Sequence, residues 1–193
     1  MEVSMKRIVI FASGSGSNAE NLIRFFQNSE QASVVLVLTN NPHAKVLERC
    51  KNLNVSALSF NRTAFTKTDD VLNILKSSKP DLIVLAGFLW KFPEFILKDF
   101  ENKVINIHPA LLPKYGGKGM YGMHVHNAIV ENKETETGIT IHYVNENYDE
   151  GATIFQAKCE VLPQDTADDV ATKIHNLEME HFPKVVEELL NEY

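Results

Sequence analysis

Residues 7–26 read RIVIFASGSGSNAENLIRFF, and this stretch decides the fold class. Its first six residues are mostly β-branched or aromatic, which predicts a buried strand over residues 7–12. Apolar residues then recur at helical spacing, which predicts a helix over residues 17–27. Because a strand that leads through a glycine turn into a helix begins a crossover unit, the pattern favours an α/β protein with a parallel sheet.

The same alternation continues along the first half of the chain. Further strands are predicted over residues 34–39, 55–60, 81–87 and 104–108, and further helices over 42–53, around 71–75 and over 95–100. After a glycine- and tyrosine-rich loop, the pattern predicts strands at 138–144 and 152–160 and a last helix capped by Asp165 or Thr166. We therefore expect one domain over residues 1–193, with a Rossmann-like, doubly wound, mostly parallel sheet and an antiparallel C-terminal extension.

The bulk composition limits the classes of function. With 23% charged and 44% hydrophobic residues, the chain has the composition of an ordinary globular protein. A formal net charge of -6 argues against general nucleic-acid binding, which depends on cations that displace phosphate counterions. No apolar run reaches membrane length or the length of a signal peptide, and two distant cysteines form no disulfide framework. We expect a cytoplasmic protein that acts on small molecules.

The glycine loop at residues 13–19 (SGSGSNA) has three interpretations. Between a strand and a helix it can hold a phosphate monoester through Gly16, Ser17 and Asn18, since the first N–H groups of the helix point toward the ligand. Its spelling also fits a dinucleotide site, but the second strand ends in Thr-Asn-Asn at 39–41, without the acid that would hold a ribose. A plain turn remains the third interpretation, and we favour the phosphate site.

A second polar feature lies where the fifth predicted strand ends. Alternation along the strand puts Asn106 and His108 on one face, at the carboxyl edge where ligands of parallel sheets bind. An amide and an imidazole in that position can donate hydrogen bonds to the oxyanion of a tetrahedral intermediate. A histidine that merely bonds a loop carbonyl is the structural alternative.

An acidic turn at residues 145–151 (NENYDEG) can supply a carboxylate for His108. A nearby carboxylate would raise the pKa of the imidazole and orient its ring. We expect this residue to be Asp149, while Glu146 and Glu150 compete for the role and a solvated surface turn is the alternative.

Four histidines allow a metal-site interpretation, which we consider weaker. His124 and His126 form a His-x-His pair in the long loop at 111–127, but no cysteine accompanies them and no third ligand stands at short spacing. The other two are His108 and His142. We expect no metal.

Several motifs together resemble the glycinamide ribonucleotide (phosphoribosylglycinamide) branch of the folate-dependent formyltransferases. They are SGSGSN at 13–18, DLIVLAGF at 81–88, NIHPALLPK at 106–114, and 138–142 followed by Asp149 and Gly151. The similarity covers nearly the whole chain. It implies transfer of a formyl group from 10-formyltetrahydrofolate to the amine of glycinamide ribonucleotide, a step of purine synthesis, in a monomer or a homodimer.

The resemblance also implies roles for individual residues. The catalytic positions fall on Asn106, His108 and Asp149. Substrate contacts fall on Gly16, Ser17, Asn18, Ala19, Glu20, His142 and Glu178. Folate contacts fall on Lys67, Leu89, Trp90, Lys91, Phe92 and Asn106. The family has a cis peptide before the proline matching Pro113, many relatives have an arginine where Lys67 is the nearest basic residue, and the loop at 115–126 is longer here.

Overall fold

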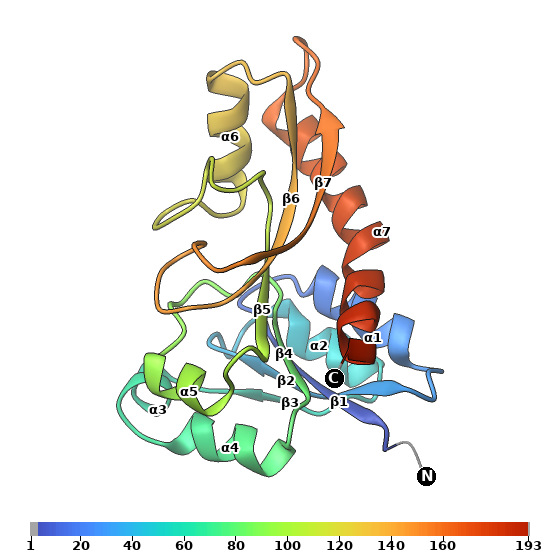
Figure 1. The fold of residues 1–193 in the computed structure, drawn as a ribbon, viewed down its shortest axis with the longest axis vertical. Helices are drawn as coiled ribbons and strands as arrows, with labels where there is room; N and C mark the ends of the chain where they lie inside the picture. The colour runs from blue at the N-terminus through green and yellow to red at the C-terminus, as the bar shows by residue number, and fades with distance from the viewer. Residues whose placement is uncertain (1–3, 193) are drawn as a thin grey trace.

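A seven-stranded sheet forms the centre of the protein in a computed structural model that describes residues 4–192 (Figure 1). Its strand order is β3-β2-β1-β4-β5-β6-β7. The first five strands are parallel: β1 (Lys6–Phe11), β2 (Ala32–Thr39), β3 (Ala57–Ser59), β4 (Leu82–Leu85) and β5 (Val104–His108). The last two are antiparallel: β6 (Glu136–Tyr143) and β7 (Thr153–Glu160). The predicted fold class is confirmed, while residues 1–3 and 193 of the predicted span lie outside the described part.

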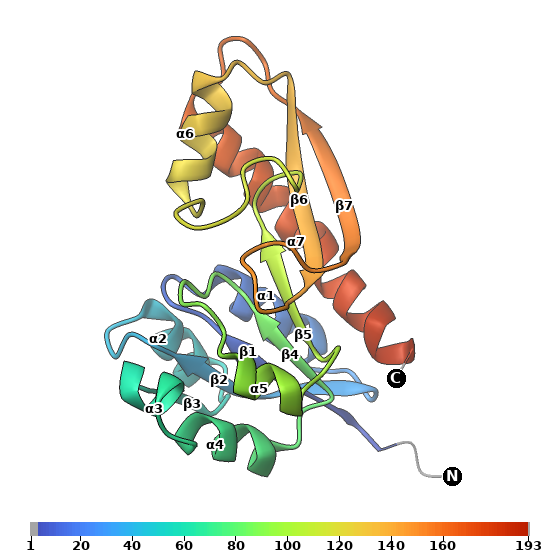
Figure 2. The same cartoon turned by 60° about the vertical axis from the view of Figure 1, so that its left-hand side comes forward.

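Helices cover both faces of the sheet (Figure 2). One face packs against α1 (Ser17–Phe26), α2 (Lys45–Asn52) and α7 (Ala167–Glu192), and the other against α3 (Arg62–Thr66), α4 (Asp70–Ser78) and α5 (Glu94–Asp99). Alternation in β1 explains this, because Ile8 and Ile10 enter the first core, and Val9 and Phe11 the second. All four side chains are fully buried, and each such burial contributes about 1.5–3 kcal/mol.

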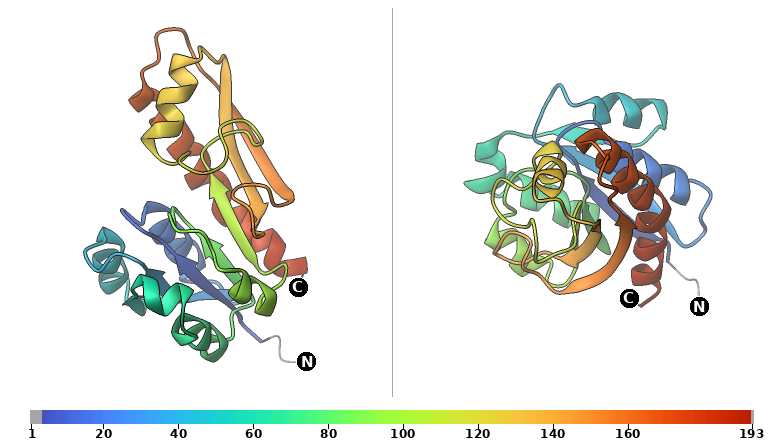
Figure 3. Two further views of the ribbon diagram at one scale, coloured as in Figure 1. Left: turned by 90° about the vertical axis from the view of Figure 1, so that its left-hand side faces the viewer. Right: turned by 90° about the horizontal axis from the view of Figure 1, so that it is seen from above.

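The C-terminal half extends the molecule beyond the parallel strands. Helix α6 (Met123–Glu131), β6, β7 and the beginning of α7 project past the carboxyl end of β5, and α7 runs back along the molecule to α1 (Figure 3). Of the two predicted caps, Thr166 is the one observed, since the Asp169 N–H donates to its Oγ1 at 3.2 Å and the Asp169 carboxylate accepts from its N–H at 2.8 Å. In the described residues, no helix has the length and apolar character needed to span a membrane.

Several predicted boundaries were wrong. The helix predicted from residue 42 begins at Lys45, because Asn41 first accepts the His43 N–H in a side-chain turn. The strand predicted over 55–60 has only three residues, Ala57–Ser59.

Two helices were missed. Helix α3 has only five residues, too few to leave a periodic pattern, and its signal is the Asn61 side chain that accepts the Ala64 N–H. Helix α6 lies in the segment predicted as the end of the long loop, where glycines and tyrosines obscure the buried pair Val125 and Ile129. The end of the predicted loop is therefore a helix, whose buried residues Val125 and Ile129 pack into the core.

Candidate active site

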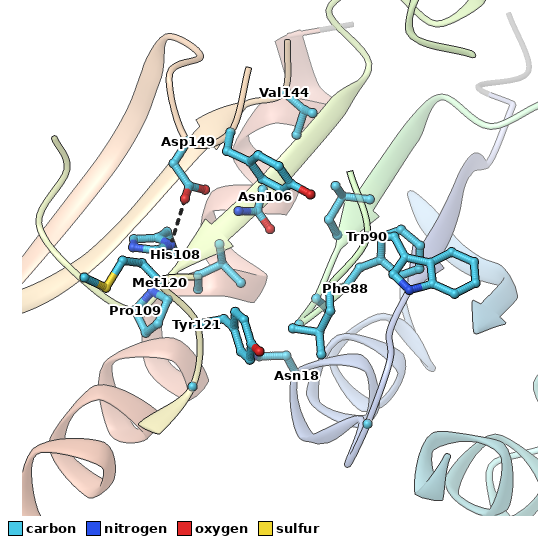
Figure 4. Close-up of a pocket in the computed structure, with 18 of the residues that line it drawn as sticks. Asn18, Phe88, Trp90, Asn106, His108, Pro109, Met120, Tyr121, Val144 and Asp149 are labelled. Atoms are coloured by element: carbon cyan, nitrogen blue, oxygen red, sulfur yellow. Dashed lines mark ion pairs between the residues drawn. The ribbon is translucent and has the colours of Figure 1, made fainter. Parts of the chain in front are cut away.

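A cavity of about 770 Å³ lies at the carboxyl ends of the parallel strands. It is lined by the loops that follow β1, β4 and β5, by residues 117–122, by the β6–β7 turn and by one side of α7. Figure 4 places His108 and Asp149 on one side of this cavity, Phe88 and Trp90 on the other, and Asn106 between them. The edge predicted from the strand pattern is therefore the edge that carries the cavity.

Asn106 is held by the neighbouring antiparallel strand. It pairs in register with His142 on β6, and the two side chains meet with Asn106 Nδ2 at 3.1 Å from His142 Nε2. His142 Nδ1 lies 2.8 Å from the Tyr143 carbonyl, which can only accept, so Nδ1 carries a hydrogen and Nε2 can accept from the amide. One N–H of Asn106 is thus used to fix the side chain, and the second can donate into the cavity.

His108 contacts an acceptor at each ring nitrogen. Its Nε2 donates to the Tyr115 carbonyl at 2.7 Å, and its Nδ1 lies 3.6 Å from Asp149 Oδ2 (Figure 4). Burial lowers the pKa of His108 below its ordinary value, against the raising effects of the Asp149 carboxylate and the Tyr115 carbonyl. The predicted raising effect of Asp149 on this pKa is confirmed, but burial outweighs it, so the net shift is downward.

Asp149 is the acidic residue of the β6–β7 turn that faces the histidines. Its Oδ2 accepts the Gly117 N–H at 2.9 Å, and its Oδ1 lies 3.6 Å from His142 Nε2. Burial raises the pKa of Asp149, but His142, His108 and the Gly117 N–H together outweigh that effect, so the pKa lies below its ordinary value. Glu146 and Glu150, the competing candidates, are both exposed.

The glycine loop leads directly into α1. Gly16 has a φ of 73° and precedes the first helical residue. The carbonyls of the loop point away from the cavity, with Gly14 accepting the Val46 N–H at 3.2 Å and Ser15 accepting Arg49 Nε at 2.7 Å. The first N–H groups of a helix have no partner within the helix, so the loop presents donors to the cavity that Gly16, Ser17 and Asn18 line.

Gly16→Ala should destabilise the protein, since a Cβ there would overlap the Val46 side chain and the left-handed backbone would be strained. We expect a loss of about 3 kcal/mol in the free energy of unfolding, measured by urea denaturation. Gly14→Ala is the matched control, because its Cβ would meet nothing within 4 Å. Equal losses in the two variants would contradict this account of Gly16.

The glycine loop meets α7 through a buried pair. Asn18 Nδ2 donates to Glu178 Oε2 at 3.0 Å, across 160 residues of sequence. Burial raises the pKa of Glu178 to about 7, although the Asn18 bond lowers it. The Asn18 Oδ1 atom is buried and makes no hydrogen bond within the described residues, which leaves one polar atom of this pair unsatisfied beside the cavity wall.

Leu89, Trp90, Lys91 and Phe92 form the wall opposite Asp149. Trp90 packs among three aromatic rings, with its centroid 6.1 Å from those of Phe60 and Phe65 and 6.4 Å from that of Phe88 in its own loop. This wall is therefore a rigid apolar surface.

Arg62 stacks on the aromatic wall as a cation. Its guanidinium carbon lies 5.3 Å from the centroid of the Trp90 ring. Lys67, the sequence-based candidate, is exposed at the end of α3 and does not line the cavity. Arg62 is the first residue of α3 and Lys67 follows its last, so the two cations lie at opposite ends of this helix.

Two other predicted contact residues also lie away from the cavity. Ala19 is fully buried in the core behind α1, and Glu20 forms ion pairs with Arg24, at 2.7 Å, and with Arg49. Ala19 and Glu20 come directly after Asn18 in α1, and neighbouring residues of a helix point in different directions. Their side chains therefore face away from the cavity. The remaining predicted residues line the cavity: Gly16, Ser17, Asn18, Leu89, Trp90, Lys91, Phe92, Asn106, His108, His142, Asp149 and Glu178.

The long loop, α6, the β6–β7 turn and α7 also contribute lining side chains that were not predicted as ligand contacts. These are Lys118, Met120, Tyr121, His126, Tyr148 and His175. The loop length was the available signal for the first three. The peptide between Leu112 and Pro113 is cis, as the resemblance implied. No three His, Cys, Asp or Glu side chains in residues 4–192 gather closely enough to hold a metal ion.

The arrangement suits chemistry at a carbonyl carbon. A free amide N–H, an imidazole nitrogen and a carboxylate border one open space, so a developing oxyanion can be stabilised and a proton can move nearby.

Residues 6–186 match the family described as formyl transferase. Phosphoribosylglycinamide formyltransferase of Bacillus subtilis is 33% identical over 193 residues, covering 96% of this chain and 95% of that protein. The chloroplastic enzyme of the same name from Vigna unguiculata is 33% identical over 98% of this chain, which spans 62% of its length. The trifunctional purine biosynthetic protein adenosine-3 of Drosophila melanogaster is 35% identical over 96% of this chain, which spans 14% of its length.

Solved structures agree with the sequence comparisons. The crystal structure of phosphoribosylglycinamide formyltransferase from Bacillus halodurans is 34% identical, with a TM-score of 0.85, and covers 96% of this chain and 95% of that chain. The corresponding protein from Anaplasma phagocytophilum is 30% identical, with a TM-score of 0.88, and covers 98% of this chain and 89% of that chain.

Proposed function

The chain belongs to the formyl transferase family, and on that premise we propose that it transfers the formyl group of 10-formyltetrahydrofolate to the amine of glycinamide ribonucleotide. The products are formylglycinamide ribonucleotide and tetrahydrofolate, in de novo purine biosynthesis. The observation that carries the proposal is that Asn106, His108 and Asp149 border the same cavity as the glycine loop. A phosphate-anchored amine and an acyl carbon can therefore meet beside an oxyanion donor.

The glycine loop binds the substrate phosphate in this proposal. The N–H groups that open α1 supply donors, and the positive end of the helix favours the anion. Glu178 lies next to Asn18 and accepts hydrogen bonds from the ribose hydroxyls, while His142 contacts the substrate beside Asn106. Ala19 and Glu20 shape the loop from behind rather than contacting the ligand.

The aromatic wall binds the folate. Leu89, Phe92 and Asn106 border the pterin ring, whose flat apolar faces and polar edge match this combination of side chains. Lys67, at the end of α3, and Arg62, held against Trp90 at its beginning, are the two cations proposed for the anionic tail of the folate.

The catalytic step forms a C–N bond to the substrate amine and breaks the bond from the formyl carbon to the folate nitrogen. Asn106 donates its second N–H to the oxyanion of the intermediate. His108 takes up a proton from solvent at Nδ1 as negative charge develops beside it and returns that proton when the oxyanion collapses, and Asp149 stabilises the imidazolium in between. A water near Asp149 carries a proton from the attacking nitrogen to the departing folate nitrogen, so no metal is needed.

Incubation with 10-formyltetrahydrofolate, with and without glycinamide ribonucleotide, tests this function. We expect release of tetrahydrofolate that depends on the ribonucleotide. Equal release without the ribonucleotide would indicate a formylfolate hydrolase instead. Tight binding of NAD, with no response to the ribonucleotide, would restore the dinucleotide interpretation of the glycine loop.

The same proposal includes the setting of the reaction. Residues 1–193 act as a single formyltransferase domain in the cytoplasm, as a monomer or a homodimer, with small molecules rather than nucleic acid or a membrane as partners. Light scattering of the purified protein measures the oligomeric state.

Glu178 should make ribonucleotide binding depend on pH. Its folded pKa of about 7 means that the carboxylate needed to accept ribose hydroxyls forms as pH rises through neutrality. We expect the KM for the ribonucleotide to fall between about pH 6 and pH 8, and Glu178→Gln to remove that dependence because an amide does not titrate.

The stability of the folded protein should fall as pH rises, whereas binding of the ribonucleotide should become tighter. A carboxyl whose pKa is raised by folding contributes stability below its unfolded pKa and loses it as pH rises through about 7. Glu178→Gln should therefore raise the melting temperature more at pH 8 than at pH 5. Glu180→Gln is the control, since Glu180 lies on the same helix with its side chain 60% exposed.

The KM measurement can contradict the role given to Glu178. If the KM of Glu178→Gln depends on pH in the same way as that of the wild type, Glu178 does not belong to the substrate site.

A further inference from the structure

The segment that follows the cis peptide contacts both His108 and Asp149 through its backbone. The Tyr115 carbonyl accepts His108 Nε2–H at 2.7 Å, and the Gly117 N–H donates to Asp149 Oδ2 at 2.9 Å. These two contacts set the ring plane of the histidine and the position of the carboxylate. The separation between His108 Nδ1 and Asp149 therefore depends on where residues 115–117 lie.

The backbone of this segment is under constraint. Tyr115 has a φ of 57°, a left-handed conformation that costs a residue with a Cβ about 1–2 kcal/mol. Gly116 has no room for a side chain, since a Cβ there would lie 2.6 Å from Leu112 Cδ2 and 3.3 Å from Asp149 Cβ. A segment with a strained residue and close packing keeps its position only when surrounding contacts hold it.

The side chain of Tyr115 supplies such a contact. Its hydroxyl donates to Glu134 Oε1 at 2.9 Å, and Lys114 Nζ reaches the same oxygen at 3.2 Å. Glu134 lies between α6 and β6, where its own N–H donates to the Ile129 carbonyl. The Tyr115–Glu134 bond thus ties the loop to the segment that follows α6.

The beginning of the loop is anchored separately on β6. Thr140 Oγ1 donates to the Ala110 carbonyl at 2.7 Å and accepts the Leu112 N–H at 3.0 Å. These bonds hold residues 110–112 whether or not the Tyr115 hydroxyl is present. Removing the hydroxyl should therefore loosen residues 115–117 without releasing the whole loop.

We propose that Tyr115 and Glu134 are positioning residues, whose hydrogen bond holds the loop backbone that orients His108 and Asp149. The proposal deepens the proposed function and rests on it for the effect on turnover. Neither side chain lines the main cavity, so both act through the Tyr115 carbonyl and the Gly117 N–H. A displacement of about 1 Å in a catalytic group can cost ~100-fold in rate.

Tyr115→Phe removes one oxygen atom and keeps the ring. We expect kcat to fall by roughly 10-fold or more, with the KM of each substrate changed less than about twofold, because the glycine loop and aromatic wall are untouched. Glu134→Ala should give a fall of the same kind but no larger, because the Tyr115 hydroxyl keeps its hydrogen bond with the Asn132 side chain. The double variant should lose little more than Tyr115→Phe alone, since that change already removes the bond to Glu134.

Two matched variants separate positioning from general damage. Glu134→Gln keeps an oxygen that can accept the Tyr115 hydroxyl, so it should restore most of the turnover lost in Glu134→Ala. Glu136→Ala is the control, because the carboxylate of Glu136 pairs at the surface with Lys158 rather than with Tyr115. Equal losses in Glu134→Ala and Glu136→Ala, or unchanged kcat in Tyr115→Phe, would overturn the proposal.

Nitrogen NMR of protein labelled at histidine gives a readout that does not depend on activity. In the wild type, His108 should carry its hydrogen on Nε2 and show the shift of a strong hydrogen bond. Tyr115→Phe and Glu134→Ala should both move this signal toward a weaker bond, while Glu136→Ala leaves it unchanged. A wild type without formyl transfer would refute the proposed function alone. Unmoved His108 signals in both variants would refute the positioning role.

Discussion

Asp149→Asn should reduce kcat by roughly 10³- to 10⁴-fold while leaving the fold and substrate binding intact. The change keeps the shape of the side chain, and Oδ1 of the new amide can still accept the Gly117 N–H. It removes the negative charge 3.6 Å from His108 Nδ1, so the imidazolium that forms during transfer loses its counter-charge in a buried site. Removing the carboxylate that orients a catalytic histidine costs about 10⁴ in turnover in serine proteases.

Steady-state kinetics and ligand calorimetry measure this effect together. We expect the affinities for the ribonucleotide and for a folate analogue to stay within a few-fold of the wild type. Glu150→Gln, an exposed carboxylate in the same turn, serves as the control and should keep full turnover. Unchanged kcat in Asp149→Asn would remove Asp149 from the catalytic group.

The variant should also change how stability depends on pH. The pKa of Asp149 is depressed in the folded protein, so the carboxylate contributes stability above its unfolded pKa and loses it as pH falls through the folded pKa. We expect Asp149→Asn to lower the melting temperature at neutral pH and to approach the wild type in acid. Thermal scans across this range check the sign.

Asn106→Ala should cost about 3 kcal/mol of transition-state stabilisation, equivalent to roughly 150-fold in kcat. The amide is fixed by its bond to His142 Nε2 and directs its other N–H to the cavity, so it can act on the oxyanion without reorganisation. Alanine removes this donor and also the hydrogen bond that Asn106 makes to His142 Nε2. The loss of transition-state stabilisation therefore includes the effect of a less ordered His142.

Separate measurement of kcat and KM decides what Asn106 does. An oxyanion donor acts on the transition state, so kcat and kcat/KM should fall together. A rise in KM with unchanged kcat would make Asn106 a folate-binding residue only. Asn73→Ala is a suitable control for asparagine removal, because Asn73 is exposed on α4, away from the cavity.

The sequence by itself determined the strand and helix alternation and the polar edge of the sheet. Strand periodicity placed Asn106 and His108 on one face, and the glycine loop marked the beginning of α1. These features depend on side-chain period and turn chemistry over a few residues, so they can be predicted from local pattern. The choice of Asp149 came from the resemblance as well as from the acidic turn, and the structure separates it from exposed Glu146 and Glu150.

Only the tertiary structure decided which side chains share an environment. The Asn18–Glu178 bond joins residues 160 positions apart, and the stacking of Arg62 on Trp90 depends on α3 folding back against the loop after β4. The net shift in the pKa of His108 depends on burial, which local sequence does not encode and which outweighs the raising effect predicted for Asp149. Contacts between residues far apart in sequence, and the exclusion of water from them, arise only when the chain packs. They therefore set the electrostatics of the site. Local periodicity, in contrast, was enough to predict where the site forms.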